Sequence, residues 1–230
     1  MDTPEHRSPP RVLGLFAKRP RPGHVKTRLA AATSPEWAAR VAEAFLRDLL
    51  ARLSGVAGRR VLAFDPPDAG PYFAALAPGF DLVPQGGGDL GRRMGRFFRA
   101  RLAGGAAAVV LLGSDSPTVP LPFVEQAFRE LGRADVVLGP AADGGYYLVG
   151  CGCRVPPVFD GVAWGTASVL AETVARLSDP GWRLALLPPW YDVDTLDGWR
   201  MLQGHLAALR RAGLDPGVPH TEALARLPLP

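Results

Sequence analysis

Short apolar runs alternate along the chain with segments in which apolar residues recur every three or four positions. Short runs are typical of buried strands, and the recurring pattern is typical of helices that cover a sheet. The runs predict strands at residues 11–17, 59–65, 80–84, 106–112, 134–138, 146–149 and 183–187. The recurring pattern predicts helices at residues 35–53, 71–77, 90–102, 121–131, 166–177 and 196–209. Such alternation predicts an α/β fold with a mostly parallel central sheet and helices on both faces.

One domain accounts for most of the length. No internal repeat and no long linker divides the chain, so residues 11–212 are expected to share one core. Residues 1–10 are polar and contain proline, which predicts a flexible N-terminus. Residues 213–230 are expected to form an extended, Pro-rich C-terminal tail.

The loop that follows the first predicted strand is basic. Residues 18–29 include Lys18, Lys26 and Arg28, and Gly23 allows the backbone to approach a ligand closely. Polyphosphate binding needs cations for charge and exposed N–H groups for the oxygens. The glycine spacing of a P-loop is missing. A basic loop in contact with solvent remains the alternative interpretation.

Acidic residues follow the fourth predicted strand and precede the last predicted helix. Asp115 follows the run at 106–112 after two residues, where a carboxylate is well placed to bind a hard divalent cation. Asp192 and Asp194 alternate along an extended segment, so both carboxylates can face one site and complete the metal shell. The alternatives are a turn or cap at Asp115 and a helix N-cap at Asp194 or Thr195.

Three further segments combine glycine with polar or aromatic residues. Residues 85–94 carry Gly88, Asp89 and Arg92 between a strand and a helix, which is compatible with contact to a nucleotide base or phosphate, or with a plain loop. In the second segment Asp143 precedes two glycines, which favours a tight hairpin turn. In the third, Trp164 precedes a glycine and a capping threonine, so it can line a pocket or belong to the core.

Composition narrows the function classes. The net charge of +4 is small, and the basic residues of the chain are not gathered in a stripe, so we expect no nucleic-acid partner. No apolar run is long enough to insert into a membrane. Cys151 and Cys153 are too close in sequence for an unstrained disulfide. Few thiols and no signal peptide favour a cytoplasmic location.

Six segments in this order resemble one protein family. They are PGHVKTRL (22–29), GDLGRRM (88–94), GSDSP (113–117), DGGYYLVG (143–150), WGT (164–166) and DVDT (192–195). The chain is similar to DUF2064, a family of small bacterial candidate glycosyltransferases that is related to phospholactate guanylyltransferases and molybdenum-cofactor nucleotidyltransferases. The similarity spans residues 11–202.

The resemblance implies a Rossmann-like GT-A fold, that of the nucleotide-diphospho-sugar transferases. It implies that Lys26 and Arg28 hold phosphates, and that Asp115 occupies the place of the family's metal-binding acid. The segment departs from a full Asp-x-Asp motif, because Ser114 precedes Asp115, and Ser116 and Pro117 follow it. Asp192 or Asp194 could then supply that acid.

The sequence thus predicts a transferase that binds a nucleotide through Mg²⁺ or Mn²⁺. The leading hypothesis is sugar transfer from a nucleotide-sugar donor to a small-molecule acceptor. Lys26, Asp115 and Asp143 are its candidate catalytic residues, and Gly144, Gly145, Trp164 and Thr166 its candidate substrate pocket. The alternative is nucleotidyl transfer from a nucleoside triphosphate to a phosphorylated or carboxylated acceptor, with release of pyrophosphate. A nucleotide-binding or regulatory domain without turnover is a third hypothesis. The oligomeric state is left open.

Overall fold

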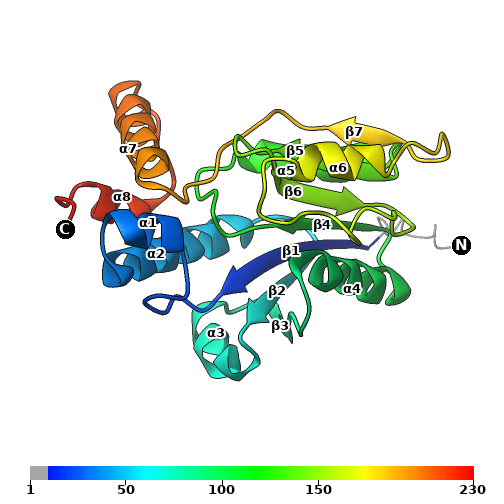
Figure 1. Cartoon of the computed structure of the whole chain (residues 1–230), viewed down its shortest axis with the longest axis horizontal. Coiled ribbons are helices and arrows are strands. Elements are labelled where there is room, and N and C mark those ends of the chain that lie inside the picture. Colours follow the sequence, from blue (N-terminus) through cyan, green and yellow to red (C-terminus); the bar gives the residue numbers. More distant parts are fainter. Residues whose placement is uncertain (1–9) are drawn as a thin grey trace, which may run out of the picture.

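A mostly parallel sheet lies at the centre of the computed structural model, which describes residues 10–230 (Figure 1). Within those residues the chain forms seven strands in the order β3-β2-β1-β4-β6-β5-β7. They are β1 (Arg11–Lys18), β2 (Arg59–Asp65), β3 (Asp81–Pro84), β4 (Ala108–Leu112), β5 (Val136–Pro140), β6 (Tyr146–Cys151) and β7 (Leu184–Leu186). β6 runs antiparallel to both of its neighbours, and the other neighbouring strands pair in parallel. The predicted α/β class is therefore confirmed.

Helices follow most of the strands, and several begin where the sequence supplies a cap. They are α1 (Thr27–Ala32), α2 (Pro35–Leu53), α3 (Gly70–Leu76), α4 (Leu90–Ala103), α5 (Leu121–Glu130), α6 (Val169–Ala175), α7 (Leu196–Arg211) and α8 (Pro219–Ala225), with a 3-10 turn at Pro67–Ala69. The side chains of Ser34, Asp89 and Thr195 accept backbone N–H groups at the starts of α2, α4 and α7. Such caps satisfy N–H groups that the helix itself leaves unpaired.

Both faces of the sheet are covered. On one face, α2, α3 and α5 pack their apolar side chains against residues such as Leu15 of β1 and Leu62 of β2. On the other face, α4 contributes Phe97 and Phe98 to a second cluster that α6 and its flanking loops complete. Burying such a side chain contributes about 1.5–3 kcal/mol. These two layers fix the strands, and thereby the loops that follow them.

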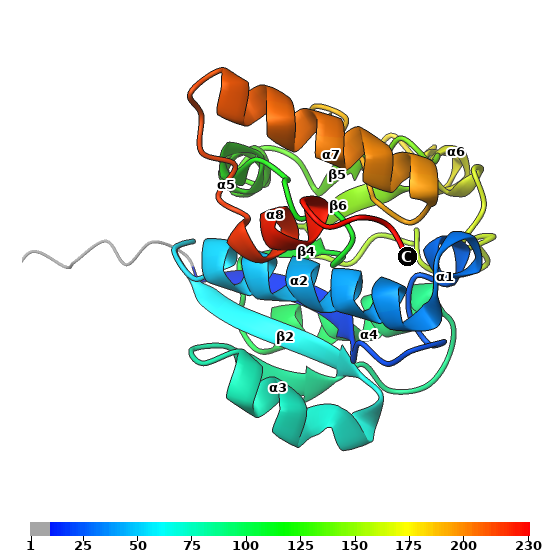
Figure 2. The same cartoon turned by 90° about the vertical axis from the view of Figure 1, so that its left-hand side faces the viewer.

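A third apolar cluster, made by helices, lies beyond the sheet. It gathers α1, α2, α7 and α8 around Phe45 and Trp199. Figure 2 shows α2, α7 and α8 lying side by side at this end of the molecule. The buried carboxylate of Asp48 on α2 accepts the backbone N–H groups of His220 and Thr221 at the start of α8.

Three local expectations differ from the structure. Residues 213–230 are not an extended tail, because Val218, Thr221 and Leu224 are buried around α8. α1 was not expected, since six residues are too few to display a helical period. The helix expected at residues 166–177 spans only Val169–Ala175. The domain limits remain a prediction, and the N-terminal segment 1–10 lies, except for Pro10, outside the described residues.

Among the described residues, no helix combines the length and the apolar character needed to cross a membrane.

Candidate functional site

Four chain segments meet at the edge where β1 and β4 end. The basic loop leaves β1 at this edge, and Gly113–Asp115 follows β4. Because β6 is antiparallel, its first residues, preceded by Asp143, also lie there. The segment before α7 joins them through a hydrogen bond from the Val193 N–H to the Asp115 carbonyl, at 2.9 Å. Ligands of open α/β sheets bind at this edge.

Lys26 connects three of these segments. Its side chain is only 2% exposed, and Nζ donates to Asp115 Oδ1 at 2.6 Å and to the Val193 carbonyl at 2.8 Å. Nζ also lies 3.5 Å from Asp194 Oδ1 and 4.6 Å from the centre of the Phe45 ring. The Lys26 backbone is left-handed, with φ 45°, a conformation that costs a non-glycine residue about 1–3 kcal/mol. The ion pairs and the aromatic contact offset that cost.

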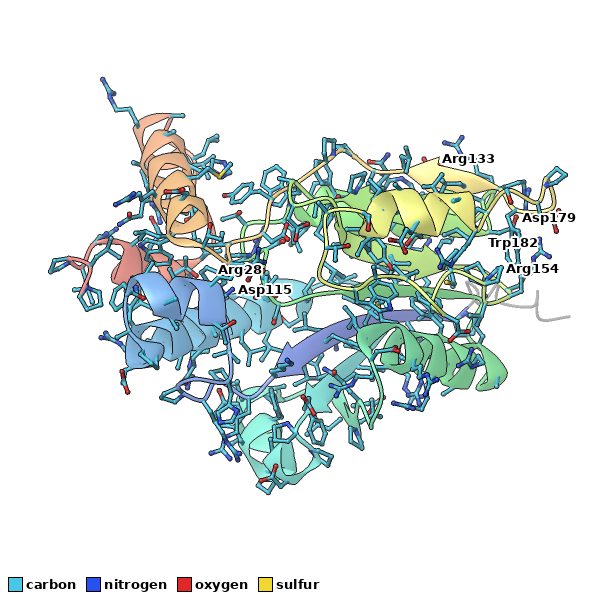
Figure 3. All side chains as sticks on the ribbon, in the orientation of Figure 1. Arg28, Asp115, Arg133, Arg154, Asp179 and Trp182 are labelled. Carbon is cyan, nitrogen blue, oxygen red and sulfur yellow. The ribbon has the colours of Figure 1, made fainter. Side chains whose placement is uncertain are left out.

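Arg28 holds the other side of Asp194. Its guanidinium lies 3.0 Å from Asp194 Oδ2 and is 61% exposed. The Asp115 side chain is 46% exposed, so its carboxylate still faces the solvent-filled space beside Lys26. Figure 3 shows Arg28 and Asp115 close together at this end of the sheet.

The carboxylates outnumber the cations here. Burial, followed by the charges of Asp143, Asp194 and Asp115, raises the pKa of Asp192 to about 7. Burial, followed by the charge of Asp115, also raises the pKa of Asp194, against the opposing effect of Lys26 and Arg28. The Oδ1 atom of Asp192 is buried and has no hydrogen-bond partner in the structure. A site of this kind attracts a cation or hydrogen-bond donors.

A divalent cation fits the chemistry of these donors but not their present arrangement. Mg²⁺ and Mn²⁺ prefer carboxylate oxygens, and the unpartnered Asp192 oxygen is of that type. Within residues 10–230, however, no three His, Cys, Asp or Glu side chains are arranged to hold a metal ion. The Lys26 ammonium instead contacts Asp115 and Asp194. The metal role of Asp115, Asp192 and Asp194 therefore stays a prediction that requires side-chain rotation.

Two cavities open on either side of this centre. The first, which we call the basic cavity, has a volume of 360 Å³, and its lining includes Lys18, His24 and Lys26. The second, the acidic cavity, has a volume of 240 Å³ and runs along β6 past Asp143 and Asp192. Phe16, Leu90, Gly113, Asp115 and Asp194 line both cavities, so the two are parts of one cleft.

Most of the residues singled out from the sequence line this cleft. They are Lys18, Lys26, Asp115, Asp143, Gly145, Trp164, Thr166, Asp192 and Asp194. Arg28 reaches the cleft only through Asp194. The structure brings these side chains together, while their individual roles stay predictions.

The remaining candidates do not line either cavity. Asp89 caps α4 by accepting the Arg92 N–H, and the Arg92 side chain is exposed. Gly88 and Gly23 have positive φ angles of 98° and 78°, which explains glycine at both turns. At Gly144, a Cβ would meet the Ala167 carbonyl oxygen at 2.3 Å, so this glycine permits a close backbone contact.

Sequence reasoning missed several residues that line the cleft. The buried Gln85 donates from Nε2 to the carbonyls of Ala17 and Ala63, which fixes the wall of the basic cavity. His24, Phe16 and Tyr146 also face the cleft. A polar residue directly after a predicted strand was a usable signal for Gln85, whereas Phe16 looks like any other core residue.

Comparison with known proteins gives the same grouping as the six sequence segments. The sequence model of a family described as an uncharacterized protein conserved in bacteria, DUF2064, matches residues 49–166. The crystal structure of a candidate nucleotide-diphospho-sugar transferase from Desulfovibrio desulfuricans G20 superposes with a TM-score of 0.82. It is 34% identical, and the alignment covers 94% of this chain and 96% of that one. The chain belongs to the DUF2064 family.

More distant structures share the fold of this DUF2064 protein. A cytidylyltransferase from Leptospira borgpetersenii serovar Hardjo-bovis (strain JB197) has a TM-score of 0.55 at 13% identity and covers 94% of both chains. CMP:2-keto-3-deoxy-manno-octonic acid synthetase complexed with CTP has a TM-score of 0.52 at 14% identity, over 89% of this chain and all of that one. No curated protein matches the sequence of this chain.

Proposed function

We propose that this protein is a metal-dependent glycosyltransferase that uses a nucleotide-sugar donor. The observation that carries the proposal is the contact between Lys26 and Asp115. It places a cation suited to binding phosphates beside a carboxylate suited to binding a metal, in one cleft. The family relative from Desulfovibrio desulfuricans, a candidate nucleotide-diphospho-sugar transferase, supports the same reaction class.

The two cavities suit the two halves of such a reaction. In this proposal, Lys18 and Lys26 hold the diphosphate in the basic cavity, and Lys26 stabilises the negative charge that develops on the departing nucleoside diphosphate. Asp115 and Asp194, with Asp192, would hold Mg²⁺ or Mn²⁺. When bound, that ion would neutralise phosphate charge.

The transfer itself requires a base near the acceptor. The acceptor hydroxyl oxygen bonds to the anomeric carbon of the sugar while the bond from that carbon to the diphosphate oxygen breaks. Asp143 is the candidate that receives the hydroxyl proton, because it lines the acidic cavity and its carboxylate accepts the Gly145 N–H, which orients it.

Nucleotidyl transfer is the second candidate function. The basic loop favours it, since Lys18 and Lys26 also suit a triphosphate, and the two cytidylyltransferase-type structures share the fold. In that reaction the acceptor attacks the α-phosphate and pyrophosphate leaves.

The products separate the two functions. A thermal-shift screen of nucleoside triphosphates and nucleotide sugars with Mg²⁺ or Mn²⁺ identifies the nucleotide, because a ligand that binds the folded state raises the melting temperature. Incubation with acceptors then yields either nucleoside diphosphate or pyrophosphate. Nucleoside diphosphate release that depends on acceptor and metal supports glycosyl transfer, and pyrophosphate release contradicts it.

A further inference from the structure

The two cavities differ sharply in charge. Of the residues that line the acidic cavity, Asp115, Asp143, Asp192 and Asp194 are acidic and none is lysine, arginine or histidine. The basic cavity shares Asp115 and Asp194 with it, but its lining adds Lys18, His24 and Lys26. The chain as a whole carries 26 Lys and Arg against 22 Asp and Glu, so a cleft wall with this composition departs from the average surface.

The negative charge of the acidic cavity is not cancelled by its neighbours. Lys26 compensates Asp115, and Arg28 compensates Asp194. Asp143 accepts a hydrogen bond from the Gly145 backbone and has no recorded salt bridge among the described residues. Asp192 likewise has an unpartnered oxygen. A dication held by Asp115, Asp194 and Asp192 would still leave Asp143 without a compensating charge, and a bound diphosphate would add further negative charge.

An anion that enters this cavity therefore meets repulsion. Two like charges a few ångströms apart repel each other, and the repulsion is stronger near a protein surface than in water. Hydroxyl groups face no such penalty, because carboxylate oxygens accept hydrogen bonds from them.

The rest of the lining suits a small molecule with apolar faces and hydroxyl edges. Trp164 and Tyr146 meet edge to face, with ring centres 6.2 Å apart, and Leu90, Met94 and Val169 complete the wall. The volume of 240 Å³ lies below the range of about 300–1,000 Å³ that is typical of pockets for drug-sized ligands. A group of monosaccharide size fits it better than a second nucleotide does.

We infer that the acidic cavity binds the acceptor, and that this acceptor is an uncharged, hydroxyl-bearing molecule of monosaccharide size, not a phosphorylated or carboxylated one. The inference rests on the proposed function, and it narrows that function to a class of substrate.

The charge of the cavity can be measured without knowing the acceptor. In a Cys153→Ser background, which removes the exposed thiol and leaves the buried Cys151, a cysteine replaces Thr166 in the cavity lining. Thr166→Cys is treated with a trimethylammonium methanethiosulfonate and with its sulfonate analogue. The matched control is Ala163→Cys, an exposed position nearby that does not line the cavity.

The expected ratio of the cationic to the anionic reaction rate is about tenfold higher at Thr166→Cys than at the control, since a local potential changes encounter rates by this order. Asp143→Asn should move the ratio toward that of the control. Equal ratios at the two positions would contradict the inference directly.

Binding of matched ligands tests the acceptor class. Glucose, galactose, mannose and ribose are compared with their phosphate esters by saturation-transfer NMR, with Mg²⁺ and the nucleoside diphosphate that gives the largest thermal shift. We expect at least one neutral sugar to bind about tenfold more tightly than its ester. The inference is overturned if no neutral sugar binds, or if the esters bind more tightly and lose affinity in Arg28→Ala.

Two further outcomes separate this inference from the proposed function. Pyrophosphate release would contradict the glycosyltransferase proposal. The charge preference of the acidic cavity would still be measured by the thiol reaction rates and by the binding of sugars and their esters. Competition between a bound neutral sugar and a complete nucleotide sugar would assign the acidic cavity to the donated sugar and overturn its assignment to the acceptor.

Discussion

The two ends of the sheet carry ion clusters of opposite balance. Figure 3 shows Asp115 at one end and Arg154 with Trp182 at the other. At the end away from the cleft, Asp135 accepts the Arg183 backbone N–H and side chain at 3.0 and 3.2 Å, and Arg154 lies 3.9 Å away. The Arg154 guanidinium also stacks on the Trp182 ring at 3.7 Å. Here two cations surround one carboxylate.

The pKa shifts follow that balance. Hydrogen bonds from the Arg183 backbone and then its side chain lower the pKa of Asp135. At the cleft, burial and neighbouring acids raise the pKa of Asp192 to about 7. A satisfied ion cluster is a stabilising feature, whereas an excess of buried negative charge lowers stability unless a ligand neutralises it. The comparison therefore supports our proposal that ligands bind at the Asp192 end, and it favours a structural role for the Asp135 end.

The largest expected effect is at Asp115. Asp115→Asn should weaken metal-dependent nucleotide binding by about 100-fold or more. Mutating a group that only hydrogen-bonds to a metal ligand already lowers metal affinity by about 10–100-fold, and losing a ligand should cost more. The melting temperature should change by no more than about 2–4 °C, since the amide oxygen can still accept from Lys26. Titration calorimetry in Mn²⁺ measures the affinity, and an unchanged value would remove Asp115 from the site.

Lys26→Ala should affect both binding and stability. The loss of the ammonium leaves Asp115 without its nearest cation and Asp194 with Arg28 alone, which should cost about 1–3 kcal/mol of unfolding free energy. Affinity should fall far more for nucleotides than for nucleosides. Lys18→Ala is the matched control, since Lys18 lines the same cavity but is exposed, and it should weaken nucleotide binding without lowering stability. Equal losses for nucleotide and nucleoside would contradict phosphate contact.

Asp192 should make stability depend on pH when no metal is present. Its folded-state pKa of about 7 lies above the ordinary value of 3.8, so the folded protein holds this proton more tightly than the unfolded chain does. Stability should therefore fall as the pH rises from 3.8 to about 7 and stay low above it. Asp192→Asn cannot ionise, so it should be more stable than the wild type at pH 8, by about 1 kcal/mol or more, and similar to it below pH 4. Urea unfolding at both pH values measures the difference, and identical profiles would refute the raised pKa.

The smallest effect is expected at the opposite end. Asp135→Asn should lower stability by about 1 kcal/mol at pH 7 and leave ligand affinity unchanged. Because the folded-state pKa of Asp135 is lowered, its contribution is present above the unfolded pKa and is lost as the pH falls through the folded one. A change in nucleotide affinity in this variant would contradict a purely structural role for the Asp135 end of the sheet.

The sequence predicts the frame of the molecule well where local signals are strong. β2 is found at residues 59–65, as its apolar run indicates, and α2 begins after its Ser34 cap and ends at Leu53. The direction of β6 could not be predicted, because an apolar run is the same read in either direction. α8 was overlooked because a proline-containing end suggests a tail, while Val218 and Leu224 are buried by tertiary contacts.

The candidate site is likewise predictable from the sequence only in part. That Lys26 and Asp115 lie at one edge follows from their places after β1 and β4. Their direct pairing depends on the left-handed backbone of Lys26 and on the path of the chain from β7 to Val193, neither of which has a local signature. The crowding of Asp143 against Asp192 likewise depends on the direction of β6.

The contact between Asp48 and the start of α8 links the last residues of the chain to the cleft. Asp48 lies less than one helical turn after Phe45, whose ring underlies the Lys26 ammonium. A chain cut before Pro219 would leave the Asp48 carboxylate without the N–H groups that it binds and would uncover the helical cluster around Phe45. Such a shortened protein would keep every residue of the cleft, yet lose part of the packing that holds the Phe45 ring against the Lys26 ammonium.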